Sequence, residues 1–227
     1  MSLHLQYRPK TFKEVTGHKE IIKSIESLFK EENKPHAFLL SGNSGCGKTT
    51  LARIMGNSLN AEVVEFNIAN VSGVDFIREL EEKARYSPLI GENKVFILDE
   101  CHQLTKEAGN CLLKILEDSP KYSYFFLCTT DPSRLLLAIR NRCTSYTLKP
   151  LSDNEIKELL KIVITAEKIN LSEDILDLII YKANGVPRSA LVYLNQVKDI
   201  KDFEEATKLL ADEITEEEDV INLCRIL

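Results

Sequence analysis

The sequence predicts an α/β fold in which a five-stranded parallel sheet flanked by helices is followed by a small, purely helical domain. Three observations support this prediction. The apolar run 37–40 leads into a glycine-rich turn and a helix-forming segment, and a second apolar run, 95–98, ends in two acidic residues. After Pro150 no strand-like run remains, and apolar residues recur at helical spacing.

The turn at 42–50 has the complete spacing G-x-x-x-x-G-K-T of a phosphate-binding loop, placed between a strand and a helix. Its glycines allow successive backbone N–H groups to surround an anion, and the helix that follows directs its positive end at the same point. Lys48 can reach the β- and γ-phosphates, and the Thr49 hydroxyl can bind Mg²⁺. Nucleotide contacts are therefore expected at Asn43, Ser44, Gly45, Cys46, Gly47, Lys48, Thr49 and Thr50.

The second apolar run ends at Asp99 and Glu100, the pattern of a Walker B strand. The carboxyl end of a buried parallel strand is where such a sheet presents functional groups. Asp99 would hold Mg²⁺ through water, and Glu100 would orient the water that attacks the terminal phosphate. Two acids after a strand are often only a solvated strand end, but the preceding phosphate-binding loop favours the functional interpretation.

The remaining elements follow from apolar periodicity and from turn residues. An extended arm at 7–17 precedes the first helix. One strand lies between the two motifs and two follow them, which predicts the strand order 5-1-4-3-2. The expected strands are 37–41, 63–67, 94–100, 124–129 and 145–148, and the expected helices are 20–32, 48–59, 74–86, 153–167, 172–183, 187–197 and 203–210.

These elements divide into an ATPase core at 1–150 and a helical lid domain at 151–213. A further helix begins near Glu216, and its apolar residues have no partner left in the chain. We therefore expect 214–227 to be the start of a truncated third domain.

Composition restricts the function classes. The 227 residues are 44% hydrophobic and 28% charged, as in a folded globular protein. No apolar run approaches the roughly 18 residues of a membrane span, and no signal-peptide core is present, so we expect an intracellular, cytoplasmic protein without membrane contact. Six cysteines without a C-x-x-C pair argue against zinc or redox sites, and a net charge of −6 argues against strong independent binding of nucleic acid.

Several short motifs occur in one order along nearly the whole chain, and together they resemble the clamp-loader ATPases of the AAA+ superfamily. The greatest likeness is to the gamma/tau subunits of bacterial DNA polymerase III, with replication factor C small subunits and their phage counterparts as more distant relatives. Segments 74–88 and 110–117 strengthen the resemblance. The motifs are Tyr7-Arg8-Pro9, Gly42 to Thr49, Asp99-Glu100-Cys101-His102, Thr129-Thr130-Asp131-Pro132, Asn141-Arg142-Cys143 and Gly185-Val186-Pro187-Arg188.

The resemblance implies that ATP and Mg²⁺ are the cofactors and that further residues have defined roles. Thr130 would be sensor 1 near the γ-phosphate, and Arg188, next to Pro187, would be sensor 2. Arg142 would reach the neighbouring subunit's ATP as an arginine finger, which requires an oligomer. The adenine would be held by Tyr7, Arg8, Pro9, Val15, Thr16 and Gly17.

The resemblance also implies regulatory and DNA contacts. Asn67 occupies the position of a polar switch residue that can hold the catalytic glutamate turned away until DNA binds. Arg78 and Lys114 match positions that touch template phosphates. A helix arginine and a helix lysine are also ordinary solvated surface charges, so that alternative stands beside DNA binding.

Some residues depart from the family pattern. Asn141 replaces the usual serine, His18 replaces a usual glutamine, and the four-cysteine zinc module of bacterial gamma subunits is absent. These departures indicate a phage or divergent version. His102 is also typical of superfamily 2 helicases, but none of their downstream motifs occurs, so we interpret His102 as a packed or coupling residue.

The leading functional hypothesis is the ATP-hydrolysing motor subunit of a loader that opens a sliding clamp and places it on primer–template DNA. Its partners would be other loader subunits, in a heteropentamer joined through the missing collar domain, while the chain by itself would be monomeric. A replication initiator or helicase loader of the same superfamily is an alternative. A stator subunit that keeps the finger without turning over ATP is another, opposed by the intact Lys48, Thr49 and Glu100.

Overall fold

The structure is a computed structural model that describes residues 2–211, and this part of the chain forms two compact units. The first unit, 8–151, contains the sheet, and the second contains residues 2–7 together with 152–211. The beginning of the chain, which the sequence analysis assigned to the sheet domain, therefore packs with the helices.

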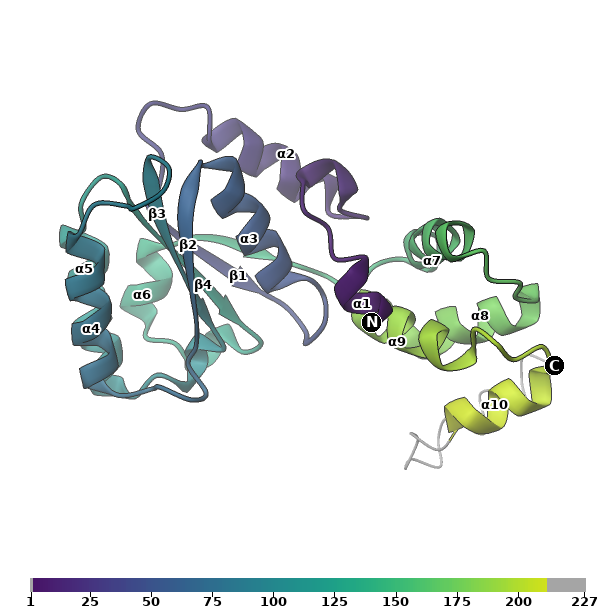
Figure 1. Cartoon of the computed structure of the whole chain (residues 1–227). Coiled ribbons are helices and arrows are strands. Elements are labelled where there is room, and N and C mark those ends of the chain that lie inside the picture. The colour runs from purple at the N-terminus through teal and green to yellow at the C-terminus, as the bar shows by residue number, and fades with distance from the viewer. Residues whose placement is uncertain (1, 212–227) are drawn as a thin grey trace. The chain divides into compact units, whose positions relative to one another are not determined.

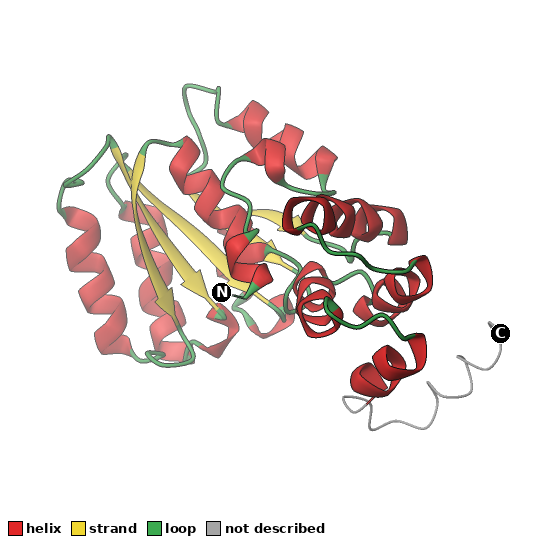
Figure 2. Cartoon of the chain, turned by 45° about the vertical axis from the view of Figure 1, so that its right-hand side comes forward, coloured by secondary structure: helices red, strands yellow, loops and turns green. Residues whose placement is uncertain are grey.

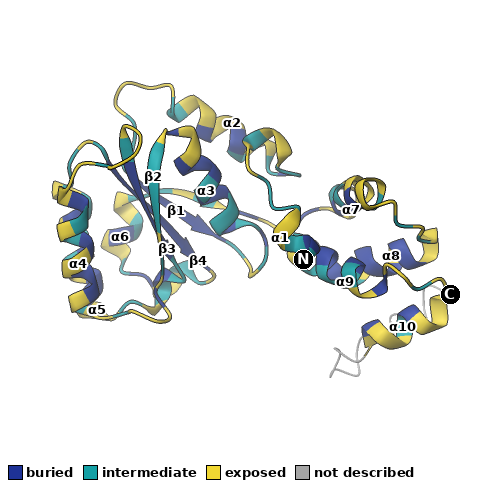
Figure 3. Cartoon of the chain, in the orientation of Figure 1, coloured by how far each residue is buried: buried dark blue, intermediate teal, exposed yellow. Residues whose placement is uncertain are grey.

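The sheet has five parallel strands in the order β2-β3-β4-β1-β5, which confirms the predicted order. Figures 1 and 2 show this sheet with helices on both of its sides. The three central strands are almost wholly buried, whereas the edge strands β2 and β5 are partly exposed (Figure 3). A strand with neighbours on both sides and helices on both faces must be apolar throughout. The strands are β1 (Ala37–Ser41), β2 (Ala61–Asn67), β3 (Asn93–Asp99), β4 (Ser123–Thr129) and β5 (Thr144–Thr147).

Helices cover both faces of the sheet because alternate residues of each strand point to opposite sides. Phe38 and Phe126 pack in one core with α2 (Lys19–Leu28) and α3 (Lys48–Ser58). On the other face, Phe96 and Phe125 pack with three helices. These are α4 (Val74–Arg85), α5 (Lys106–Asp118) and α6 (Leu137–Arg142). Short 3₁₀ turns lie at η1 (Phe12–Glu14), η2 (Cys101–Gln103) and η3 (Pro132–Arg134).

The second unit is helical, and local capping residues fix its helix boundaries. Ser152 and Glu155 form a reciprocal capping box, and Pro187 occupies the first turn of its helix. Asn184 ends the preceding helix in the left-handed conformation. The helices are α1 (Leu3–Gln6), α7 (Asp153–Glu167), α8 (Glu173–Ala183), α9 (Pro187–Val197) and α10 (Phe203–Ala211). No helix within residues 2–211 is long and apolar enough to cross a membrane.

Some boundaries differ from the predicted ones. Helix α2 ends at Leu28, before the predicted 32, and the predicted extended arm contains both α1 and η1. Helices α5 and α6 were not assigned from the sequence. The predicted third domain, 214–227, lies outside the described residues.

Parallel register brings the strand ends to one edge of the sheet. Asn67 pairs with Asp99, and Ser41 pairs with both Thr129 and Thr147. The loop that follows Ser41 therefore starts beside the polar ends of the neighbouring strands, which is where α/β sheets bind ligands.

This arrangement depends on Gly42. Leu148 donates its N–H to the Ser41 carbonyl, which brings the chain after β5 against the loop. A Cβ at Gly42 would lie 2.4 Å from the Leu148 carbonyl oxygen, and the φ of Gly42 is +147°. The glycine is therefore required by close approach and by backbone conformation.

We predict that Gly42→Ala lowers the free energy of unfolding by roughly 2 kcal/mol or more, because it combines backbone strain with a clash. Gly73→Ala is the control: its φ is −89°, and a Cβ there meets nothing within 4 Å. Urea unfolding followed by circular dichroism measures both. Equal midpoints for the two variants would contradict the predicted role of Gly42.

Candidate nucleotide site

The glycine-rich loop joins β1 to α3 and has the geometry of a phosphate cradle. Gly45 and Gly47 both have left-handed backbone angles, with φ of +77° and +104°. A Cβ at Gly47 would meet nothing within 4 Å, so the loop is open on that side. Asn43 and Ser44 are exposed on the same loop. Together with the amino end of α3, this arrangement fits an anionic ligand.

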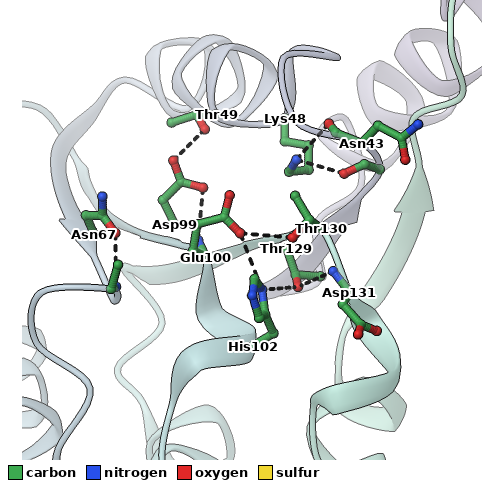
Figure 4. Close-up of polar contacts among 12 residues, drawn as sticks. Asn43, Lys48, Thr49, Asn67, Asp99, Glu100, His102, Thr129, Thr130 and Asp131 are labelled. Atoms are coloured by element: carbon green, nitrogen blue, oxygen red, sulfur yellow. Dashed lines mark hydrogen bonds and ion pairs between the residues drawn. The ribbon is translucent and has the colours of Figure 1, made fainter. Parts of the chain in front are cut away.

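Lys48 is the first residue of α3, and its side chain lies within the loop. Only 6% of the residue is exposed, and Nζ donates to the backbone oxygens of Gly42 at 2.8 Å and Asn43 at 3.0 Å (Figure 4). A buried ammonium requires such acceptors. Its charge therefore stands at the cradle, where phosphate oxygens can replace the carbonyl partners.

The two predicted magnesium ligands meet directly. The Thr49 hydroxyl donates to Asp99 Oδ2 at 2.8 Å, and the other Asp99 oxygen accepts the Glu100 backbone N–H at 3.0 Å (Figure 4). Hydroxyl and carboxylate oxygens are the donors that Mg²⁺ prefers, so the residues fit this ion. No group of three or more His, Cys, Asp or Glu side chains among residues 2–211 indicates another metal site.

Glu100 lies at the sharp turn between β3 and η2. Its φ is +51°, an uncommon left-handed value for a residue with a side chain. Its Oε2 accepts a hydrogen bond from the Thr130 hydroxyl at 3.2 Å and lies 3.3 Å from Nδ1 of His102 (Figure 4). The structure therefore brings the predicted catalytic acid and the predicted sensor 1 together.

Two further residues, which the sequence analysis did not assign to the site, complete this polar group. His102 Nδ1 is 3.1 Å from the Thr129 hydroxyl oxygen, which also accepts the Asp131 backbone N–H at 3.0 Å. A hydrogen bond from Ser133 lowers the pKa of Asp131. Two features of the sequence could have indicated these residues. Thr129 is a polar residue at the end of the apolar run of β4, and His102 follows Glu100 by two positions.

Asn67 ends β2 next to Asp99, but its side chain is engaged elsewhere. Its Oδ1 accepts the Ala69 backbone N–H at 3.0 Å, which closes a local turn (Figure 4). Within the part of the chain that the structure describes, no hydrogen bond joins Asn67 to Glu100. The structure does not bring together this predicted switch pair.

Cys46 belongs to the loop, but its side chain is buried. Only 4% of the residue is exposed, it packs in the core beneath α3, and burial raises the pKa of its thiol. Cys46 can therefore offer a bound phosphate its backbone N–H and not its sulfur. Burial raises the pKa of a second thiol, that of Cys143, to about 12.

Arg142 is the last residue of α6 and forms an ion pair with Glu117 of α5. Helix α5 begins near the carboxyl ends of the strands and ends just before β4 starts, so Glu117 lies towards the opposite end of the sheet from Lys48. Both side chains are about half exposed, at 48% for Arg142 and 43% for Glu117. Arg142 therefore points away from the loop of its own chain.

The predicted DNA contacts lie on neighbouring helices of one face of the sheet. Arg78 is exposed on α4 and pairs with Asp75 at 3.1 Å, and Lys114 is exposed on α5. Lys114 also borders a small hollow that includes Arg85 and Asp118. The positions suit contact with a large partner, and their roles remain predictions.

The predicted adenine contacts are divided between the two units. Tyr7 lies in the helical unit, where its hydroxyl donates to Glu167 at 2.5 Å, and this bond raises the tyrosine pKa. Arg188, the predicted sensor 2 and not an adenine contact, follows Pro187 at the start of α9 in the same unit and is exposed. The residues in the sheet unit are Arg8, Pro9, Val15, Thr16 and the buried Gly17.

The chain is similar to known proteins in sequence and in fold. The model of a family described as "DNA polymerase III, delta subunit" matches residues 63–152. The chain is 33% identical to the tau/gamma subunit of DNA polymerase III from Haemophilus influenzae, with 84% of this chain and 31% of that protein covered. It is 35% identical to the gamma subunit from Buchnera aphidicola subsp. Schizaphis graminum, with 82% and 58% covered. For the tau subunit of Bacillus subtilis the identity is 32%, with 86% and 39% covered.

The chain thus spans between about one third and somewhat more than half of these relatives. Among solved structures, the Holliday junction branch migration motor RuvB of Thermotoga maritima matches with a TM-score of 0.74 and 22% identity. That match covers 91% of this chain and 72% of RuvB, and at this identity it shows the fold alone. The chain is therefore a homologue of the gamma/tau subunits of DNA polymerase III and has the AAA+ fold.

Proposed function

We propose that this chain is the ATP-hydrolysing motor subunit of a sliding-clamp loader. The single observation that supports hydrolysis best is the meeting of Thr49, Asp99, Glu100 and Thr130 beside Lys48 at one edge of the sheet. The DNA polymerase III homologues support a place in replication inside the cell. Loading a clamp onto primer–template DNA is the function that this family resemblance implies.

The residues divide the chemistry between them. Lys48 exchanges its carbonyl partners for β- and γ-phosphate oxygens, while Thr49 and Asp99 hold Mg²⁺. The ion, when bound, neutralises charge on the phosphates. Glu100 orients the attacking water and takes its proton, and Thr130 contacts the γ-phosphate.

Turnover in this proposal depends on assembly. Because Arg142 points away from its own loop, it serves the ATP of an adjacent subunit, where it stabilises the charge that develops in the transition state. Arg188 acts as sensor 2, and Arg78 and Lys114 bind DNA phosphates. Other loader subunits and the clamp are the remaining partners.

Two other functions share most of these residues. A replication initiator or helicase loader would use the same ATP site, and a stator would keep Arg142 without turning over ATP. The complete Lys48, Thr49 and Glu100 set favours a hydrolysing subunit over a stator. ATPase measurements with a sliding clamp and primed DNA discriminate further, because joint stimulation by both is expected only of a loader.

We predict that Glu100→Gln retains ATP binding while hydrolysis falls by orders of magnitude, because the amide cannot take the proton of water. Lys48→Ala should instead lose ATP affinity. Equilibrium binding of a fluorescent ATP analogue and phosphate release distinguish the two. Hydrolysis by Glu100→Gln at the wild-type rate would contradict the assignment of the base.

Cys46 should react slowly with thiol reagents near neutral pH, because burial disfavours the reactive thiolate and raises its pKa. The rate should rise with pH between about 7 and 10, as the thiolate fraction grows. ATP should slow the reaction further by closing the loop. Mass spectrometry of labelled peptides measures this, with the partly exposed Cys111 as internal reference. Equal labelling of Cys46 with and without ATP would contradict its place in the nucleotide site.

We further predict that Arg142→Ala in the assembled complex lowers turnover at the adjacent site while this subunit's own ATP affinity changes little. Arg142→Lys should not restore the rate, because lysine lacks the planar guanidinium fork. Mixing Arg142→Ala and Glu100→Gln subunits should recover part of the activity, since some interfaces then combine an intact Glu100 with an intact Arg142. No recovery despite confirmed assembly would mean that Arg142 acts within its own subunit or only structurally.

A further inference from the structure

His102 stands out among the side chains to which the proposed mechanism gives no role. It lies in the 3₁₀ turn η2, directly after Glu100, and the buried Cys101 anchors this turn. The Gln103 N–H donates to the Glu100 carbonyl at 3.0 Å, so the chain folds back on the acid. The His102 side chain is only 9% exposed, whereas that of Glu100 is 29% exposed. The His102 ring is thus surrounded by protein and is more deeply buried than the Glu100 carboxylate.

His102 has two close polar neighbours. Nδ1 forms a hydrogen bond with the Thr129 hydroxyl at 3.1 Å and lies 3.3 Å from Glu100 Oε2. The Thr129 oxygen accepts the Asp131 N–H and still has a proton to donate, so its contact suits either tautomer of the ring. Only the tautomer with a proton on Nδ1 presents a donor, and not a lone pair, on the side of Glu100 Oε2.

The same oxygen of Glu100 also receives the Thr130 hydroxyl at 3.2 Å. The Thr130 hydroxyl and the His102 ring thus approach Oε2 from different segments, one directly after β4 and the other in the turn after β3 (Figure 4). This leaves Oε1 to receive the proton of a water molecule. Among the described residues, the Glu100 side chain contacts Thr130 and His102, and no hydrogen bond joins it to Asn67.

We propose that His102 is the positioning residue that keeps Glu100 aimed into the site when Thr130 leaves it for the γ-phosphate. This proposal rests on the proposed hydrolytic function, in which one hydroxyl proton cannot serve both Glu100 and the γ-phosphate. When Thr130 turns to the nucleotide, the Nδ1–H of His102, 3.3 Å from Oε2, is the donor that remains beside this oxygen. Thr129 holds the ring in place at the end of β4, so the orientation of the base is linked to the strand that carries sensor 1.

A purely structural role makes a different prediction. If His102 only tied η2 to Thr129, its loss would lower stability and would not alter the catalytic step selectively. A positioning role lowers kcat and leaves ATP binding intact, because His102 faces Glu100 and not the cradle formed by Lys48. The two roles can therefore be separated by kinetics and by a conservative variant.

The kinetic experiment uses the full chain in its assembled complex with a clamp and primed DNA. We expect His102→Leu to lower kcat for ATP by about 10- to 100-fold, the effect of losing one hydrogen bond to a charged group, with KM within about twofold. His102→Asn, whose side-chain amide can place an N–H near the position of Nδ1, should recover most of this loss. His36→Leu is the matched control: its Nδ1 also faces an acceptor, the Ser123 carbonyl at 3.1 Å, at the opposite end of the sheet. It should keep the wild-type kcat.

The second experiment does not depend on ATPase activity and measures the tautomer of the His102 ring directly. Two-bond ¹H–¹⁵N correlation spectra of the labelled chain distinguish the two neutral tautomers, with His102→Asn used for assignment. We expect a proton on Nδ1 of His102, and we expect its population to fall in Glu100→Ala. An Nε2–H tautomer in the wild-type chain would overturn the proposal, as would a spectrum unchanged by Glu100→Ala.

The outcomes distinguish this proposal from the proposed function. If the wild-type complex does not hydrolyse ATP, the proposed function fails and the spectra alone decide the ring state of His102. If the wild type hydrolyses ATP while a folded His102→Leu has the same kcat, the positioning role is wrong. The same holds if His102→Asn is no better than a folded His102→Leu. If His102→Leu does not fold, His102→Asn and the spectra decide.

Discussion

The hydrogen bond from Thr49 to Asp99 joins two segments fifty positions apart, and the parallel sheet is what makes it possible. Thr49 stands in the first turn of the helix after β1, and Asp99 is the last residue of β3, two strands away. Only a fully parallel register places both at the same edge at hydrogen-bonding distance. The buried strand β4 between them fixes the spacing, because its side chains fill the cores on both faces. Loss of this register would separate the loop from the acids.

The parts of the fold that the sequence predicted are those in which local pattern and burial agree. Strands β1, β3 and β4 are continuous apolar runs because they are covered on both faces, and the helical unit carries explicit caps such as Ser152 and Pro187. The end of α2 was predicted too late because 29–32 still have helix-forming residues, while the helix already ends at Leu28. The beginning of the chain was predicted to belong to the sheet domain, whereas residues 2–7 pack with the helices, because a motif does not report which core a segment joins.

The candidate site was predictable as a set of residues but not as a set of contacts. The motifs predict that Lys48, Asp99 and Glu100 lie near one edge of the sheet, because strand ends in a parallel sheet converge. They do not show that the Asn67 side chain accepts the Ala69 N–H and closes a local turn. Whether Asn67 bonds to the nearby backbone or to a distant side chain depends on the competition between these partners, which a motif does not reveal. Nor do the motifs show that Cys46 points into the core. The contact between His102 and Glu100 arises from the backward fold of a three-residue turn, which has no periodic signal.

The two positively charged side chains that the proposed mechanism uses, Lys48 and Arg142, differ in how deeply they are buried. Lys48 is buried and has two backbone acceptors, so a ligand that removes them must supply equivalent oxygens, and phosphate does. Arg142 is half exposed, and its ion pair with Glu117 is of the surface type that typically contributes about 1 kcal/mol or less. Exchanging Glu117 for a phosphate in a neighbouring subunit therefore costs little. The fixed cation suits binding within one chain, whereas the weakly held one suits a contact that forms only when subunits meet.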